Sequence, residues 1–292
     1  MIFTTRFAPS PTGPLHLGHA YSALLAHDLA RAAAGRFLLR IEDIDHTRSR
    51  PEWERQILED LTWLGVTWDA LPMRQSDRTQ AYGAALQELW SRGLLYACSC
   101  TRRDIAAAVS APQEGAEIPH GPDGLIYPGT CRHRYPRDTA KPPDGMALRL
   151  DMAAALAALA TPLAGFVETG PDGRAPGRRI MVSGDDLTSR VGDIVLSRKD
   201  FFGSYHLSVV LDDAAQAITH VIRGEDLFDA TQIHVLLQAL LRLETPVYLH
   251  HRLIRDETGR RLAKRDDARA IATYRAEGRR PQEIREMVGL TA

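Results

Sequence analysis

The stretch Arg6-Phe-Ala-Pro-Ser-Pro-Thr-Gly-Pro-Leu-His-Leu-Gly-His19 decides how the rest of the chain is interpreted. It begins within a short apolar and β-branched run, residues 2–7, which is typical of a β-strand. Its prolines and Gly13 exclude regular structure. Apolar residues then recur at helical spacing up to Gly35, so a helix is predicted to begin close to His16. The sequence therefore predicts a strand, a stiff turn and a helix whose N-terminal end faces the turn.

Such a helix end suits a polyphosphate, because unpaired backbone N–H groups and the positive end of the helix dipole point the same way. His16 and His19 are three residues apart, so both imidazoles lie on one side of the first turn and can donate to phosphate oxygens. Gly18 has no Cβ, so a base or a ribose can approach the backbone there. The alternative is a proline-rich turn with two surface histidines, which an isolated His-x-x-His would favour.

The whole stretch resembles the HIGH signature of class I aminoacyl-tRNA synthetases, with His16-Leu-Gly-His19 in its place. The preceding Arg-Phe-Ala-Pro-Ser-Pro-Thr-Gly is similar to the glutamyl and glutaminyl branch in particular. The resemblance implies an α/β fold with a Rossmann-type catalytic domain and an ATP-dependent ligase activity.

Composition limits the classes of protein that the chain can belong to. At 292 residues, with 44% hydrophobic and 25% charged residues, it has the composition of a soluble globular protein with more than one lobe. It contains no apolar run long enough to cross a bilayer, and it enters the motif directly, so we expect no membrane and no signal peptide. Three cysteines form no paired framework, so the cytoplasm is the default location. A monomer is the default oligomeric state, because the sequence does not indicate another.

Charge does not by itself identify a nucleic-acid-binding protein, because the net charge is −1. Residues 251–292 nevertheless hold eleven Arg and Lys against seven Asp and Glu, and Arg132-His-Arg134-Tyr-Pro-Arg137 is a second basic cluster. Both are compatible with binding of a small structured RNA, and a solvated face is the ordinary explanation of each.

A second strand is predicted at residues 36–41, which completes a β-α-β unit and leads directly into Glu42. Ligands of open α/β sheets lie beyond the carboxyl ends of strands, so Glu42 is placed to bind the ammonium of an amino acid. The alternative is a solvated loop. Residues 40–48 again resemble the glutamyl-type synthetases, which implies that Glu42 contacts the substrate amine.

Further elements follow from local pattern. Helices are predicted over residues 51–65 and 79–92 and a strand over 94–97. The sheet is predicted to resume with strands at 193–197, 205–211 and 218–222. Prolines and glycines cluster between these groups, so the predicted division is a split catalytic domain (1–97 and 191–250), an insertion (98–190) and a C-terminal region (251–292).

A metal site is predicted in the insertion. Cys98 and Cys100 are close together and Cys131 follows after a loop, a set that suits a tetrahedral structural zinc. Three scattered buried cysteines are the alternative, and the fourth ligand stays open among Tyr127, His120 and His133, with a histidine the choice from the residues alone.

Here a second resemblance bears on the metal ligands. Cys-x-Cys followed by Tyr-x-x-x-Cys is similar to the zinc site of the short glutamyl-tRNA synthetase paralogues that charge queuosine in aspartate tRNA. That resemblance implies one structural zinc held by Cys98, Cys100, Tyr127 and Cys131.

Arg223 lies between an apolar strand and Gly224, where an arginine is costly without an anion partner. Arginine binds carboxylate bidentately, as glutamate recognition requires, and a surface salt bridge is the alternative. Resemblance of residues 204–213 and 221–227 to the synthetases implies that Arg6, Ser10, Tyr205 and Arg223 line the amino-acid pocket, with backbone contacts from Ala8.

Lys264 follows Gly259 in the polar segment Arg261-Leu-Ala-Lys264-Arg265 and can reach the β- and γ-phosphates of ATP. The segment resembles the KMSKS signature, with Arg261 in place of its first lysine and Ala263 in place of its serine. The resemblance implies that His16, Gly18, His19 and Lys264 bind ATP together with magnesium, and that His16, His19 and Lys264 are catalytic.

Residues 266–292 leave room for two short helices and not for the anticodon-binding domains of a full-length glutamyl or glutaminyl enzyme. The resemblance therefore implies activation of L-glutamate by ATP without tRNA, followed by transfer of glutamate to queuosine in tRNA(Asp). Three alternatives remain: a minimal synthetase that charges a 3′ end with a partner chain, a nucleotidyltransferase that shares the His-x-Gly-His turn, and a catalytically silent RNA-binding module.

Overall fold

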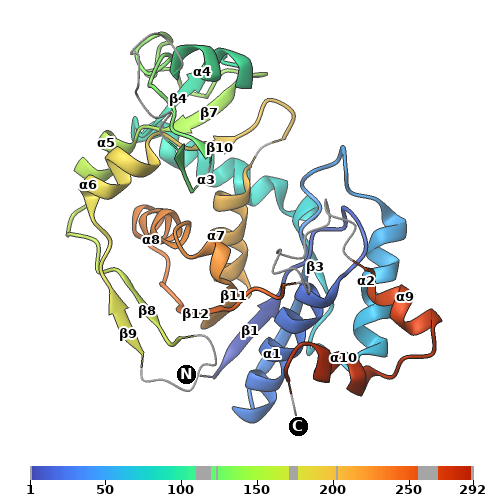
Figure 1. Ribbon diagram of the computed structural model, residues 1–292. Helices are drawn as coiled ribbons and strands as arrows, with labels where there is room; N and C mark the ends of the chain where they lie inside the picture. Colours follow the sequence, from blue (N-terminus) through green and yellow to red (C-terminus); the bar gives the residue numbers. More distant parts are fainter. Residues whose placement is uncertain are drawn as a thin grey trace.

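The computed structural model describes residues 2–109, 120–122, 124–170, 177–201, 203–255 and 269–290. At its centre lies a parallel β-sheet, and the first two strands of the chain belong to it, as predicted (Figure 1). β1 (Thr4–Phe7) and β2 (Arg36–Ile41) run parallel, and α1 (Leu17–Ala32) connects them. All four residues of β1 are buried, as are the last five of β2. The predicted strand, turn, helix and second strand are confirmed.

The remaining parallel strands extend this sheet on both sides of β1 and β2. β3 (Met73–Arg74) pairs with β2, and β11 (His220–Gly224) lies beside β1, where the N–H of Thr219 donates to the carbonyl of Thr4 at 2.9 Å. β12 (Val247–His251) runs parallel to β11. The strand predicted at 218–222 is thus confirmed. Because parallel strands end at the same edge, the sheet gathers the residues that follow β1, β2 and β11.

Helices cover both faces of the sheet, and two of them match their predicted positions. α2 (Pro51–Trp63) begins at its proline, and α3 (Thr79–Ser91) ends before the predicted Gly93 turn. A short helical turn, η1 (Gln75–Arg78), precedes α3. The chain between β11 and β12 forms another short turn, η3 (Glu225–Leu227), and then α8 (Thr231–Leu240). Of the helices that the structure describes, none has the length and apolar character needed to cross a membrane.

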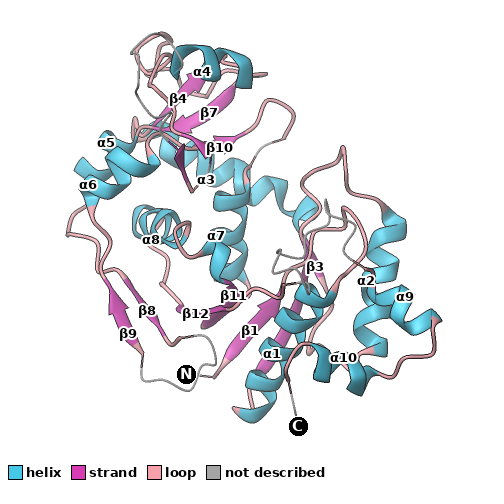
Figure 2. Cartoon of the chain, in the orientation of Figure 1, coloured by secondary structure: helices cyan, strands magenta, loops and turns pink. Residues whose placement is uncertain are grey.

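One predicted strand is wrong. Residues 205–211 form the first part of a helix, α7 (Tyr205–Ala215), seen at the centre of Figure 2. The hydroxyl of Ser204 caps this helix by accepting from the N–H of Leu207 at 3.4 Å. α7 is buried on nearly every side, so it lacks the polar face from which a helical period would be recognised.

A second, antiparallel sheet carries the upper lobe of Figure 1, in the order β10 (Val195–Ser197), β7 (Ala147–Leu150), β4 (Leu95–Cys98). β4 fits the strand predicted at 94–97. The prediction that residues 193–197 resume the parallel sheet is wrong, because β10 pairs antiparallel with β7. The other described elements of this region are α4 (Arg102–Val109), β5 (His120–Gly121), β6 (Gly124–Leu125), α5 (Met152–Ala157), α6 (Gly184–Asp186) and the π-helical turn η2 (Leu187–Val191).

Two strands of the predicted insertion join the parallel sheet. β8 (Phe166–Glu168) pairs with β12, and β9 (Arg178–Ile180) pairs antiparallel with β8. Part of residues 98–190 therefore contacts the predicted catalytic region directly, and the division at residues 97, 190 and 250 stays a prediction.

The described part of the C-terminal region contains two short helices, α9 (Ile271–Ala276) and α10 (Pro281–Met287), for which the sequence left room. They lie beside α2 and α1 at the right of Figure 1. Arg285 donates to both oxygens of Asp28 on α1, at 2.8 and 2.6 Å. Part of the positive charge of this region therefore attaches the two helices to the rest of the protein.

Candidate active site and metal centre

The two histidines of the first turn are held in defined orientations. His16 is the N-cap of α1: its Nδ1 accepts from the N–H of Gly18 at 3.1 Å, and its own N–H donates to Nδ1 of His19 at 3.2 Å. The ring centres lie 3.8 Å apart. Because each Nδ1 accepts, each neutral ring carries its proton on Nε2 and can donate from that atom. A Cβ at Gly18 would lie 3.0 Å from His16 Cε1, so a side chain there would push against this ring.

Four buried charged groups lie at the carboxyl ends of β1 and β2. Arg6 donates from Nε to Asp213 at 2.8 Å, Arg40 donates to Asp213 at 2.7 Å, and Arg40 also donates to Glu42 at 3.2 Å. Burial raises the pKa of Asp213, but Arg6 and Arg40 outweigh it and hold that pKa below its usual value. Burial has the larger effect on Glu42 and raises its pKa despite Arg40. The network places Glu42 with one carboxylate face available to a cation.

Arg223, at the end of β11, is surrounded by neutral acceptors. Its Nε donates to Nε2 of His250 at 3.1 Å, one terminal nitrogen contacts Nδ1 of His234 at 3.1 Å, and the other donates to Thr231 Oγ1 at 2.7 Å and to the carbonyl of Leu227 at 3.1 Å. Among the described residues it forms no ion pair, although it is only 5% exposed. A buried arginine in this state can bind an incoming carboxylate.

The two histidines of the first turn, Glu42 and Arg223 line one cleft of about 400 Å³. It brings together eight of the residues predicted for the site, from the first turn, the strand ends and the start of α7: Arg6, Ala8, His16, Gly18, His19, Glu42, Tyr205 and Arg223. A second cleft of about 930 Å³ shares Glu42 and Tyr205 with it and is lined by Ser10. The second cleft extends to Cys98, Cys100 and Tyr127, so it connects the predicted amino-acid pocket with the metal centre.

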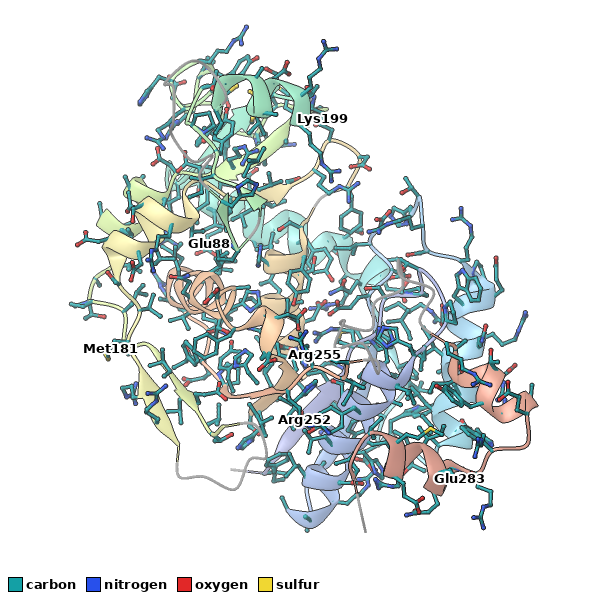
Figure 3. The ribbon with its side chains drawn as sticks, viewed as in Figure 1. Glu88, Met181, Lys199, Arg252, Arg255 and Glu283 are labelled. Carbon is teal, nitrogen blue, oxygen red and sulfur yellow. The ribbon has the colours of Figure 1, made fainter. Side chains whose placement is uncertain are left out.

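Lys264, Arg261 and Ala263 lie outside the described residues. The segments on either side of them approach the histidine turn. Leu253 and Ile254 line the 400 Å³ cleft, and the N–H of Ile271 donates to the carbonyl of Leu15 at 2.8 Å. Figure 3 labels Arg252 and Arg255 directly after β12, and the guanidinium of Arg252 lies 4.9 Å from the ring centre of Tyr21 on α1. The described residues on both sides of this segment therefore lie beside the histidine turn.

The three cysteines form a compact cluster, with all Sγ atoms within 4.8 Å of one another. Tyr127 Oη lies 3.4 Å from the Sγ atoms of both Cys98 and Cys100, and it accepts from the N–H of Cys131 at 2.9 Å. Burial raises the pKa of the Cys131 thiol, but hydrogen bonds from Tyr127 and Ser99 lower it to about 6. Three thiols and a phenol oxygen fit a tetrahedral metal site. Among the described candidates, neither His120 nor His133 joins the cluster.

The basic cluster at residues 132–137 is largely committed to internal contacts. Arg132 donates two hydrogen bonds to Asp193, at 2.9 and 2.8 Å, and Arg137 donates to Asp151 at 2.9 Å. Tyr96 donates to the same Asp193 oxygen at 2.6 Å. These contacts tie the loop that bears Cys131 to the antiparallel sheet, so Arg132 and Arg137 serve internal ion pairs, which differ from both the solvated face and the RNA-binding patch considered from the sequence.

The sequence analysis missed several residues around the site. Asp213 lay just beyond the strand predicted at 205–211 and was given no role; it belongs to α7, and packing of that helix brings its carboxylate to Arg6. His234 and His250 contact Arg223, Glu168 contacts His250, and the three belong to separate elements. No local motif identifies them, because their association depends on the pairing of β8 with β12.

Comparisons with known proteins agree with this geometry. The family model described as "tRNA synthetases class I (E and Q), catalytic domain" matches residues 3–292. A protein of Rhodobacter capsulatus named glutamyl-Q tRNA(Asp) synthetase is 59% identical over 98% of this chain and 99% of its own length. One of the same name from Symbiobacterium thermophilum is 41% identical, over 96% of this chain and 83% of its own.

A solved structure gives the same result for the fold. A glutamate tRNA ligase from Elizabethkingia meningosepticum, in complex with its amino acid, is 26% identical with a TM-score of 0.70. The match covers 99% of this chain and 61% of that ligase, so this chain spans less than two thirds of the ligase.

Proposed function

Because the chain belongs to the family of class I tRNA synthetases for glutamate and glutamine, we propose that it activates L-glutamate with ATP and transfers the glutamate to queuosine in tRNA(Asp). The observation that carries the proposal is the cleft in which His16, His19, Glu42 and Arg223 meet. Near-complete coverage of relatives named for this activity supports the choice of queuosine over a 3′ end.

In the first step, one oxygen of the glutamate α-carboxylate attacks the α-phosphate of ATP, and pyrophosphate leaves. Glu42 binds the ammonium, and Arg223 and Arg6 orient the carboxylates, so the attacking oxygen is positioned before reaction. The Nε2–H groups of His16 and His19 donate to phosphate oxygens as charge moves onto them. Lys264 stabilises the leaving pyrophosphate, and magnesium accompanies the nucleotide. The walls of the two clefts are completed by Ser10, Ala8, Tyr205 and Gly18.

In the second step, a hydroxyl of queuosine attacks the carbonyl of the glutamyl-adenylate, an ester forms and AMP leaves. The 930 Å³ cleft beside Glu42 and Tyr205 is large enough to admit a nucleoside to the amino-acid pocket. No covalent intermediate with the protein is needed, and catalysis rests on positioning and on phosphate electrostatics.

Cys98, Cys100, Cys131 and Tyr127 would hold one zinc ion. Its role would be structural, since it would crosslink β4 to the loop before Arg132 within a small buried cluster formed by Tyr96, Cys98, Tyr127 and Cys131. The proposal also includes a cytoplasmic location, because the tRNA substrate is found there, and a monomer as the default oligomeric state.

Exchange of labelled pyrophosphate into ATP tests the first step. We expect exchange that depends on L-glutamate and needs no tRNA, with no exchange when glutamine or aspartate replaces glutamate. Absence of glutamate-dependent exchange from the wild-type protein, with and without tRNA, would contradict the proposed function and favour an RNA-binding module.

A further inference from the structure

Arg223 and Arg6 are held differently, although both are buried at the same cleft. Arg6 forms a direct ion pair with Asp213. Arg223 uses four of its five N–H groups on neutral acceptors, and of the ion pairs between described residues none includes it. A carboxylate in direct contact would compete with a substrate for the guanidinium. The neutral shell around Arg223 keeps its charge available.

A carboxylate from another part of the chain holds His250, one of the neutral acceptors around Arg223. Glu168, the last residue of β8, places Oε2 at 2.6 Å from Nδ1 of His250. Its Oε1 accepts from the backbone N–H groups of His250, at 3.0 Å, and Gly170, at 3.2 Å. Burial lowers the pKa of His250, which keeps the ring neutral. An ionised carboxylate only accepts, so the ring carries its proton on Nδ1 and presents the lone pair of Nε2 to Arg223.

We propose that Glu168 is a positioning residue for the glutamate pocket: its carboxylate selects the tautomer of His250, and that tautomer holds the Arg223 guanidinium in place to bind a substrate carboxylate. The inference rests on the proposed function and names a residue, from the predicted insertion, that never touches the substrate. Pairing of β8 with β12 brings Glu168 to His250, so the insertion contributes to amino-acid affinity.

The substitution Glu168→Gln separates this role from simple packing, because it keeps the shape of the side chain. The two backbone N–H groups require the oxygen of the new amide, so its NH2 group faces Nδ1 of His250. Nδ1 must then accept, so the proton moves to Nε2 of His250. The N–H groups of His250 Nε2 and Arg223 Nε then point at each other, and their hydrogen bond is lost. Loss of one hydrogen bond to a charged group corresponds to an increase of about 10- to 100-fold in KM for glutamate.

Glutamate-dependent pyrophosphate exchange measures the effect, with Glu244→Gln as the matched control at an exposed carboxylate. We expect KM for glutamate to rise about 10- to 100-fold in Glu168→Gln, with less than about threefold change in kcat or in KM for ATP. Imidazole ¹⁵N chemical shifts, assigned with His250→Asn, should report the Nδ1–H tautomer in the wild type and Nε2–H in Glu168→Gln.

A second variant keeps the test decisive if Glu168→Gln lowers the melting temperature. His250→Asn interrupts the same chain at Arg223, and the double variant should be no worse than His250→Asn alone, because both changes act through one contact. Three results would overturn this inference and leave the proposed function intact. They are an unchanged KM for glutamate in Glu168→Gln, additive effects in the double variant, or a loss of kcat as large as the rise in KM. A wild-type protein without exchange would instead contradict the proposed function, and the inference with it.

Discussion

The carboxylate of Asp213 is predicted to be the group that holds Arg6 of the amino-acid pocket and the adjacent buried Arg40 together. Its Oδ1 lies 2.8 Å from Nε of Arg6 and 2.7 Å from a terminal nitrogen of Arg40, and all three residues are at most 5% exposed. In Asp213→Asn the two guanidinium groups keep Glu42 as their one remaining carboxylate partner within this network. Uncompensated buried charge of this kind costs about 3–5 kcal/mol.

We therefore expect Asp213→Asn to lower the free energy of unfolding by about 3–5 kcal/mol at pH 7, measured by urea denaturation. At about 2 °C for each kcal/mol, the melting temperature falls by about 6–10 °C. Arg6 loses the partner that orients it, so KM for glutamate rises as well. Asp138→Asn, at an exposed position in a loop, is the matched control and should change neither quantity.

The pH dependence of this difference has a defined sign. The pKa of Asp213 is lowered in the folded protein, so its stabilising contribution is complete above the unfolded pKa, about 4, and is lost as pH falls through the folded pKa. The gap between wild type and Asp213→Asn should be full at pH 7 and should narrow below about pH 4. A gap under about 1 kcal/mol at pH 7, with unchanged KM for glutamate, would refute the role given to this network.

Three further predictions concern other parts of the chain. Lys264→Ala should lower pyrophosphate exchange by about 10²–10³-fold with zinc content unchanged, and wild-type exchange rates would contradict the role of this loop. Tyr127→Phe should lose zinc on dialysis, as judged by elemental analysis, whereas Tyr135→Phe, whose hydroxyl donates to Ser99, should keep it; equal zinc in both would exclude the phenol as a ligand. Burial raises the pKa of Asp60 from 3.8 to about 6 although Arg275 lies 3.4 Å away, and neither of its oxygens accepts a hydrogen bond among the described residues, so its carboxylate destabilises the fold as pH rises through about 6. Asp60→Asn should stabilise by about 1–3 kcal/mol at pH 8 and by nothing below pH 4 in chemical denaturation, and an equal effect at both pH values would argue against a buried ionised carboxylate.

The parts of the fold that were predictable are those whose signals are local. Pro9, Gly13 and the helical spacing after Leu15 act within a few residues of one another, and the structure has the predicted strand, turn and helix there. Pro51 and the stripe that follows it identified α2 in the same way. The cysteine cluster was also predictable, because three thiols in a chain with only three cysteines leave a single grouping.

The misassigned segment shows where local pattern is insufficient. α7 contacts β10, α3 and α8, so it is buried on nearly all sides and has no solvated polar face. Val209 and Val210 also favour a strand by propensity. Tertiary packing determines that it is a helix. This error affected the prediction of the site, because the carboxylate of Asp213 lies beside Arg6 only when α7 is a helix.

The environment of Arg223 could not be predicted for a different reason. The sequence indicated that this arginine needs an anion, and the described structure surrounds it instead with two imidazoles, a hydroxyl and a carbonyl. Those groups come from η3, α8 and β12, and the carboxylate that contacts His250 comes from β8. Contacts between elements so far apart in the chain depend on strand order, which periodicity does not encode.

The most direct test of the central claim is transfer of labelled glutamate to total tRNA from cells that make queuosine and from cells that cannot. We predict label on the queuosine-containing tRNA only, in the presence of ATP and the purified protein. Equal label on both preparations would contradict the queuosine acceptor and identify an enzyme that charges the ordinary 3′ end.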